Sequence, residues 1–186
     1  NHSHINYYID ITYQKTRLSE AKAIAKQLVN HFNNSTVVDT ILCLDGTAVI
    51  GTCLADELTK GGFLSINRHQ TIYVVEPEYN ANSQMIFRDN IQPMIRGKHV
   101  LILMASVTTG YTANRSIEAI KYYGGHVCGV AAIYRAVDEV AGYPVRSVYS
   151  VADLPDYESH DYRECPYCKK GQKIDALVNS FGYSAL

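Results

Sequence analysis

Short apolar runs alternate with longer amphipathic segments over most of this chain, a pattern typical of proteins in which strands and helices follow one another. Residues 6–12 (NYYIDIT) alternate in polarity and are rich in β-forming side chains, which predicts a strand. Apolar residues dominate four later runs, and buried strands are expected there: 36–44, 72–75, 100–103 and 127–134.

Helices are predicted in three of the intervals between these strands. One extends from Ser19, an N-cap residue, to Phe32; a second covers residues 48–60 and ends at Gly61-Gly62; a third follows residue 112 with the sequence ANRSIEAIKYYGG. Residues 76–98 are polar and show no convincing regular element. We therefore expect one α/β domain with a central, mostly parallel sheet flanked by helices, which binds ligands beyond the carboxyl ends of its strands.

Composition narrows the class of protein. With 186 residues, 47% hydrophobic and 19% charged, the chain suits a single globular domain with a sizeable core. A net charge of −1 gives no basic field for nucleic acid, and no apolar run is long enough for a membrane span. The polar start NHSHINYY does not resemble a signal peptide, and the odd number of cysteines, five, favours a reduced, cytoplasmic protein.

The segment from Val100 to Thr112 (VLILMASVTTGYT) carries the strongest functional signal. A buried strand here enters a helix through a small, hydroxyl-rich turn, which leaves backbone N–H groups available for an anion. Gly110 lets the backbone approach a ligand closely, and the threonines add hydroxyl donors. The turn is therefore interpreted as a phosphate cradle (residues 108–112), although an ordinary strand-to-helix connection with a threonine cap has the same pattern.

GKHVLILMASVTTGYT resembles the phosphoribosyl pyrophosphate (PRPP) motif of type I phosphoribosyltransferases: a strand, two acidic residues and a Thr-Thr-Gly-x-Thr turn. The likeness covers most of the chain and is closest to orotate phosphoribosyltransferases. SHINYYIDIT resembles their N-terminal segment, LCLDGTAVIG their pyrophosphate loop, and ECPYCKKGQKI a tail found in some bacterial members. The resemblance implies the type I phosphoribosyltransferase fold with a small hood, formed by about residues 1–16 and 150–186, and a homodimer.

The resemblance also implies a reaction, in which a nitrogenous base displaces pyrophosphate from PRPP with the assistance of Mg²⁺. The residues implied to contact substrate are Thr108, Thr109, Gly110, Tyr111 and Thr112 at the 5′-phosphate; Asp45, Gly46 and Thr47 at the pyrophosphate; Arg88, Arg96 and Lys98 in a mobile lid over residues 79–98; and Arg135 at the base carboxylate. Residues 45–47 also suit a plain turn whose Asp caps the next helix. The lid residues also suit surface charge, and Arg135 a pair with Asp138.

One departure from the family affects the chemistry directly. Met104 and Ala105 stand where the family has two carboxylates that contact the ribose hydroxyls. A hydrogen bond to a charged group contributes roughly 1.5–3 kcal/mol, so the loss of two could cost roughly 3–6 kcal/mol. Two hypotheses follow. One is a transferase in which the missing acids are dispensable or are replaced from elsewhere, with Glu76, Asp89 and Asp138 as candidates. The other is a non-catalytic binder of PRPP or a nucleotide that acts as a regulatory protein.

Cys165-Pro-Tyr-Cys168 in the tail has the spacing of half a tetrahedral zinc site, and His160 is the nearest candidate for a third ligand. The same four residues match the redox dithiol of glutaredoxins, but only 18 residues follow Cys168, too few for a thioredoxin-like fold. A turn with two reduced thiols is the third interpretation.

Overall fold

The computed structural model describes residues 3–32, 34–60, 65–68 and 70–186. Its centre is a six-stranded sheet, in which every neighbouring pair is parallel except the last, β9 and β8. In spatial order the strands are β3 (Tyr73–Val75), β2 (Thr40–Cys43), β6 (His99–Val107), β7 (His126–Arg135), β9 (Tyr143–Ser150) and β8 (Glu139–Val140). The predicted α/β class and mostly parallel sheet are confirmed.

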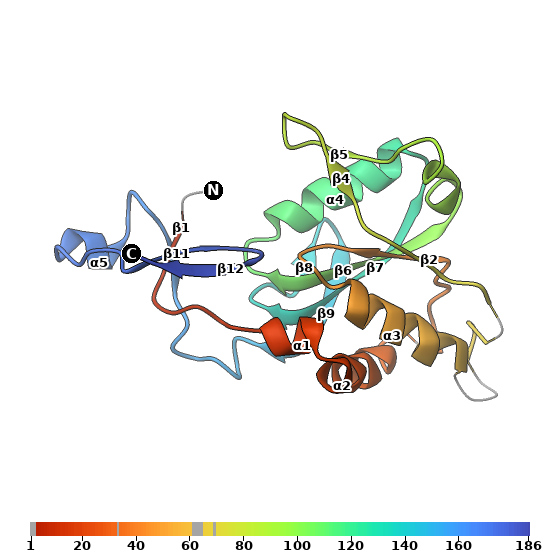
Figure 1. Ribbon diagram of the computed structural model, residues 1–186, viewed down its shortest axis with the longest axis horizontal. Helices are drawn as coiled ribbons and strands as arrows, with labels where there is room; N and C mark the ends of the chain where they lie inside the picture. Colours follow the sequence, from red (N-terminus) through yellow and green to blue (C-terminus); the bar gives the residue numbers. More distant parts are fainter. Residues whose placement is uncertain (1–2, 33, 61–64, 69) are drawn as a thin grey trace.

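Helices cover both faces of this sheet (Figure 1). On one face lie α2 (Leu18–Val29), α3 (Ala48–Lys60) and the short α1 (Thr12–Thr16); on the other lie α4 (Tyr111–Tyr122) and the 3₁₀ turn η1 (Gln92–Met94). The sheet therefore separates two apolar cores. None of the helices in the described ranges has the length and apolar character that a membrane crossing requires.

The helix predicted over residues 48–60 has the same bounds in the structure, while the Gly61-Gly62 stop lies outside the described residues. α2 starts one residue before Ser19, and its N-cap is Arg17. β6 is longer than predicted, because Met104 and Ala105 continue the strand and are only 3% and 7% exposed. These two side chains are therefore part of the wall at the end of the sheet.

The strand predicted at residues 6–12 is wrong. The described strand at this end is β1 (Ser3–Ile5), and residues 6–11 form no regular element before α1 begins. Among the described residues no strand pairs with this segment. Several of its side chains, among them Tyr8, Ile9 and Ile11, line a cavity instead.

Residues 76–98, expected to lack regular structure, contain a small hairpin. Strands β4 (Glu78–Tyr79) and β5 (Met85–Ile86) pair antiparallel. The side chain of Asn80 organises the turn, since its Oδ1 accepts the N–H groups of Asn82 and Gln84 at 2.9 and 3.0 Å. In Figure 1 the hairpin lies over the α4 face of the sheet.

The two ends of the chain lie together beside the main sheet (Figure 1). β1 pairs antiparallel with β10 (Ser159–Asp161), and β11 (Ala176–Asn179) forms a hairpin with β12 (Gly182–Ala185). The short helix α5 (Pro166–Lys169) lies between β10 and β11 in sequence. α1, although within the predicted hood residues, packs against α2 and α3.

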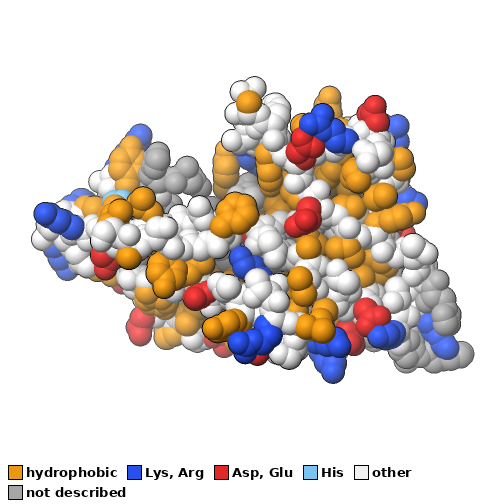
Figure 2. Space-filling view, in the orientation of Figure 1, with side chains coloured by type: hydrophobic (Ala, Val, Ile, Leu, Met, Phe, Trp, Pro, Cys, Tyr) orange, Lys and Arg blue, Asp and Glu red, His pale blue; other side chains and the backbone are white. Residues whose placement is uncertain are grey.

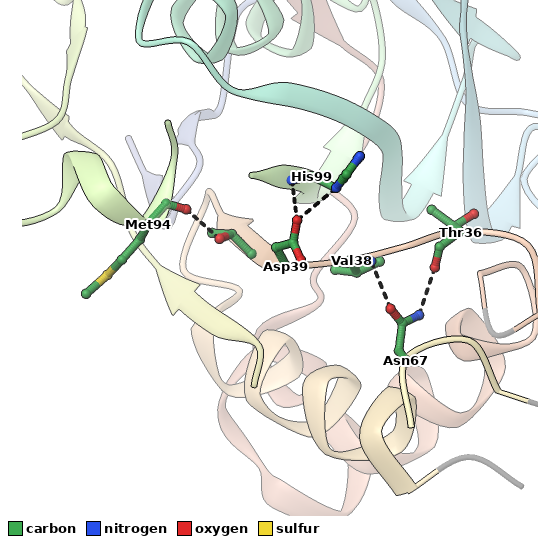
Figure 3. A network of polar contacts seen from close by, with 7 residues as sticks. Thr36, Val38, Asp39, Asn67, Met94 and His99 are labelled. Carbon is green, nitrogen blue, oxygen red and sulfur yellow. Dashed lines mark hydrogen bonds and ion pairs between the residues drawn. The ribbon is translucent and has the colours of Figure 1, made fainter. Parts of the chain in front are cut away.

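Polar contacts stabilise the amino ends of β2 and β6 (Figure 3). Asp39 accepts the backbone N–H of His99 at 2.7 Å and contacts its ring Nδ1 at 2.8 Å. Asn67, fully buried, accepts the N–H of Val38 at 2.9 Å and donates to the carbonyl of Thr36 at 2.8 Å. These bonds satisfy the buried polar groups at the amino ends of the two strands, at the opposite end of the sheet from the predicted ligand site.

Candidate functional site

The predicted phosphate cradle joins β6 to α4. Gly110, the N-cap of α4, has φ +78°, and a Cβ there would lie 2.8 Å from Cγ2 of Val140, so only glycine fits. No side chain caps the helix, and its first turn contains no acidic residue. The N–H of Tyr111 has a long 3.4 Å contact with Oγ1 of Thr109. Thr109, Tyr111 and Thr112 are exposed, so the positive end of α4 faces an open space suited to an anion.

The second loop follows β2 and contains two consecutive left-handed residues, Asp45 at φ +57° and Gly46 at φ +75°. Thr47 is fully buried, and its hydroxyl donates to the carbonyls of Leu44 at 2.7 Å and Leu103 at 3.2 Å. Thr47 therefore fixes the loop to the sheet and faces no cavity. Of the three residues predicted to contact pyrophosphate, Asp45 and Gly46 therefore line open space and Thr47 does not.

Two cavities meet at Asp45. The smaller, about 280 Å³, is called the hood cavity and is lined by Ile5, Tyr8, Ile9, Ile11, Asp45, Met104, Ala105, Ser106, Thr108, Thr112, Tyr134, Tyr157, Val178, Asn179 and Ser180. The larger, about 1160 Å³, is called the outer cleft and lies between the Asp45 loop, the β4–β5 hairpin, α4 and the turn at Ser180 and Phe181. In Figure 2 it is visible as a hollow between the hairpin at the top and the terminal segments at the left.

Tyr134, near the end of β7, projects into the hood cavity. Its side chain is 1% exposed, and its hydroxyl is the one buried side-chain N or O atom of the described residues without a hydrogen-bond partner. Its ring lies edge-on to that of Tyr157, with centroids 5.8 Å apart. An unpartnered buried hydroxyl is costly, and because Tyr134 lines the cavity its O–H is available to a ligand that enters there.

The carboxylate of Asp45 lies beside Met104 and Ala105, the two uncharged residues at the positions of the family's acids. Met104 and Ala105 line the hood cavity, and the Asp45 carboxylate accepts the N–H of Ala105 across a long 3.4 Å. Burial raises the pKa of Asp45, while this N–H and nearby Lys15 act in the opposite direction. The neighbouring strand thus supplies an acid next to the place where the resemblance implies two.

The other acids considered from the sequence lie in different places. Glu76 lines the outer cleft. Asp138 pairs with Arg135, and Asp89 accepts a bond from Gln92 at 3.2 Å. Of these three acids, Glu76 is therefore the one that shares the outer cleft with Asp45, and Glu118 of α4 lines the same cleft.

Two basic residues that the sequence did not single out lie at the site. Lys15 is 9% exposed, and its Nζ donates to the carbonyls of Asp45 and Ser180, both at 3.0 Å. Arg115 lines the outer cleft and donates to the hydroxyl of Tyr111 at 3.2 Å. Arg115 could have been predicted from the sequence, because it lies four residues after Tyr111 and therefore on the same face of the predicted helix as this cradle residue. For Lys15 no sequence signal exists, since its burial depends on the distant Ser180.

The predicted lid residues lie away from both cavities. Arg88 forms a two-contact pair with Glu78 across the hairpin. Arg96 donates to Gln92 at 3.0 Å, and Lys98 directly precedes β6, so it lies at the amino edge of the sheet. The hairpin wall of the outer cleft is instead neutral, formed by Tyr79 and residues 83–86.

Arg135, predicted to face a base carboxylate, pairs with Asp138 and lines neither cavity. Adjacent residues of a strand point to opposite faces, and it is the preceding Tyr134 that faces the hood cavity. In the tail, His160 pairs with Glu158 at 2.8 Å and is not brought to Cys165 and Cys168.

The chain is similar to phosphoribosyltransferases in sequence and in fold. The chain is 29% identical over 157 residues to an orotate phosphoribosyltransferase from Chlorobaculum parvum, covering 83% of this chain and 72% of that protein. It is 32% identical over 144 residues to an adenine phosphoribosyltransferase from Corynebacterium jeikeium, covering 73% and 65%. Among solved structures, an orotate phosphoribosyltransferase from Mycobacterium tuberculosis in complex with Fe(III) dicitrate is similar with a TM-score of 0.57 at 20% identity, covering 80% and 83%.

No protein-family model matches this chain. The resemblance to type I phosphoribosyltransferases and their fold are nevertheless confirmed by these relatives and structures, and the relatives agree with the prediction of an enzyme. Orotate and adenine enzymes both occur among the relatives, so they do not identify the base.

Proposed function

We propose that this chain, which has the type I phosphoribosyltransferase fold, binds PRPP and transfers its phosphoribosyl group to a nitrogenous base. One observation carries the proposal: the uncapped start of α4 and the unpartnered Tyr134 hydroxyl face the same cavity, whose lining includes Thr108 and Thr112. A 5′-phosphate at the cradle would direct the sugar past Met104 and Ala105 and the base toward Tyr134.

The lining of the hood cavity supports an uncharged base. Among its residues are three tyrosines and several aliphatic side chains, and none of the described lining residues is Arg, Lys or His. The lining includes the carboxylate of Asp45, and the nearby Lys15 is already bonded to the carbonyls of Asp45 and Ser180, so a second carboxylate, on the base, would be unfavourable there. Tyr134 would instead donate its O–H to a ring nitrogen or carbonyl oxygen of the base. Orotate, the substrate of several relatives, is the alternative that the experiment below includes.

The residues present also fit a magnesium ion. Mg²⁺ is commonly held by one or two carboxylates together with substrate phosphates, and Asp45 and Glu76 both line the outer cleft. The ion would neutralise charge on the departing pyrophosphate. Lys15 and Arg115 add positive charge on the protein side of the same cleft.

In this arrangement the base nitrogen forms a bond to C1 of the sugar as the bond from C1 to the pyrophosphate oxygen breaks. Asp45 would take over part of the role of the missing acids, because its carboxylate lies at the backbone of Ala105. The second candidate, a non-catalytic PRPP or nucleotide binder, is favoured by the neutrality of Met104 and Ala105.

Calorimetry with PRPP and nucleoside monophosphates, with and without Mg²⁺, tests the cradle, and a pyrophosphate-release assay over adenine, uracil and orotate tests transfer. We expect turnover by the parent and a loss on the order of a hundredfold in Asp45→Asn, equivalent to one charged hydrogen bond. Turnover only after the double change Met104→Glu with Ala105→Asp would favour the binder. No PRPP binding by the parent would contradict both.

Sedimentation of the same preparations tests the homodimer that the resemblance implies. A monomer at assay concentrations, with full turnover, would contradict it.

A further inference from the structure

The two ends of the chain bring three metal-ligating side chains together, outside the site described above. They are His4 of β1 and the tail cysteines Cys165 and Cys168, whose ligand atoms all lie within 4.8 Å of one another. Sγ of Cys168 is 3.1 Å from Nδ1 of His4. The group depends on residues 164 positions apart in sequence, brought together where β1 pairs with β10.

We propose that His4, Cys165 and Cys168 bind a zinc ion that holds the first strand of the chain to its tail. Two thiolates and an imidazole are ligands that zinc prefers, and a Cys-x-x-Cys turn supplies both sulfurs from one short segment. The set contains no oxygen ligand, which argues against Mg²⁺ or Ca²⁺. Three protein ligands leave the fourth tetrahedral position to water or another small ligand.

The local environment of Cys165 suits a metal thiolate. Cys165 is only 1% exposed, which shields its sulfur from bulk water, and this sulfur lies within 4.8 Å of both the Cys168 sulfur and the His4 ligand nitrogen. The accessible Cys168 completes the pair and leaves a route for the ion to enter.

A second set of side chains supports this turn from outside and explains why His160 is not a ligand. His160 pairs with Glu158 at 2.8 Å, and the hydroxyl of Tyr167 donates to the same carboxylate at 2.9 Å. Tyr167 lies between the two cysteines in sequence, so these bonds fix the orientation of α5. His160, which sequence proximity favoured, is thus a matched control for His4.

The ion would also act on the ligand cavity. Ile5, the residue after His4, lines the hood cavity. Asn6 continues the connection to the tail, since its side chain bonds the carbonyl of Asp156 at 2.6 Å and the N–H of Glu158 at 2.9 Å. Zinc at His4 would therefore fix one wall of the cavity without touching the substrate.

Metal analysis of the full chain, purified with reductant and one added equivalent of Zn²⁺ and then gel-filtered, tests the proposal. Cys53, a free cysteine in α3, provides a second control. We expect one zinc per chain in the parent and in His160→Ala and Cys53→Ser, and loss of bound metal in His4→Ala, Cys165→Ser and Cys168→Ser. Co²⁺ titration should give thiolate-to-cobalt charge-transfer bands and strong visible bands in the parent that are absent from Cys168→Ser.

Thermal unfolding provides a readout independent of metal retention. Zn²⁺ should raise the Tm of the parent and of His160→Ala and leave that of Cys168→Ser unchanged, and because Cys168 is exposed this variant should fold. A reduced parent that retains no stoichiometric metal, or His4→Ala with an unaltered cobalt spectrum and affinity, would overturn the proposal. So would a Cys165–Cys168 disulfide that persists with Zn²⁺ and reductant present.

Discussion

Two aspartates flank strand β2, and their surroundings are opposite. Asp39, before the strand, accepts two bonds from His99 that lower its pKa in spite of partial burial. Asp45, after the strand, is more deeply buried, has one long contact with a backbone N–H, and its pKa is raised by that burial. At the amino ends of the strands, the Asp39 carboxylate is thus paired within the protein. At the carboxyl ends, the Asp45 carboxylate has only one weak hydrogen bond.

Neutral polar groups show the same contrast. Asn67 at the amino edge is fully buried and bonded on both sides of its amide, while Tyr134 at the carboxyl edge is equally buried with no partner. Most buried polar groups have a hydrogen-bond partner, so the unpartnered Tyr134 hydroxyl supports the proposal that a ligand binds at the carboxyl ends of the strands.

The largest expected effect comes from closing the cradle. Gly110→Val places a side chain against Val140 at a backbone conformation that favours glycine, and should weaken PRPP binding by on the order of a hundredfold or more. The matched control is Gly97→Ala at the amino edge, where φ is +70° but no atom lies within 4 Å of the added Cβ. Calorimetry should find PRPP affinity unchanged in the control; equal losses in both variants would remove the distinction between the edges.

Asn67→Ala should reduce the free energy of unfolding by about 2–3 kcal/mol, because it leaves the buried N–H of Val38 without a partner. Ligand affinity at the other edge should not change. Urea unfolding measures the first quantity and calorimetry the second. A stability equal to that of the parent would show that the network in Figure 3 contributes little.

Tyr134→Phe should reverse this pattern. Removing an unpartnered buried hydroxyl should leave stability unchanged or raise it by up to about 1 kcal/mol. Affinity for the base or nucleotide should fall about tenfold, the value of one lost hydrogen bond. Tyr157→Phe, which removes the hydroxyl of the neighbouring ring in the same cavity, is the control and should leave this affinity unchanged. If Tyr134→Phe instead destabilises the fold and spares binding, the hydroxyl is structural.

The smallest effects separate the two aspartates by pH. The pKa of Asp39 is lowered, so its contribution to stability is present above the unfolded pKa near 4 and is lost as pH falls through the lower folded value. The pKa of Asp45 is raised, so its ionised form destabilises the fold above that raised value, and the penalty disappears as pH falls below the unfolded pKa.

Asp39→Asn should therefore be less stable than the parent, and Asp45→Asn more stable, each by about 1 kcal/mol near pH 7. The Asp45 difference should shrink as pH falls toward about 4, whereas the Asp39 difference should shrink only as pH falls below about 4. Thermal unfolding of the three proteins over this range measures them, and differences of the same sign would contradict the contrast.

Features dictated by local sequence were predictable. The helix at residues 48–60 has the same bounds in sequence and structure, and the cradle is a continuous segment whose glycine is required locally. Features that depend on distant partners were not. Lys15 is buried by Ser180, Asp45 meets Ala105, and His4 meets Cys168 only after β1 and β10 pair. The strand prediction for residues 6–12 failed for the same reason. An alternating pattern indicates that one face of a segment is covered, but it does not indicate which distant part of the chain covers it.

The construction of the hood cavity has a consequence for biosynthesis. Ile5 and Ser180 both line it, and Lys15 bonds the carbonyl of Ser180. Domains begin to fold while their chains are still being made, so the sheet and its two cores can assemble from the central residues first. The hood cavity can close only after residue 180 has emerged from the ribosome, so a nascent chain stalled before that point would have a folded centre and an open cavity.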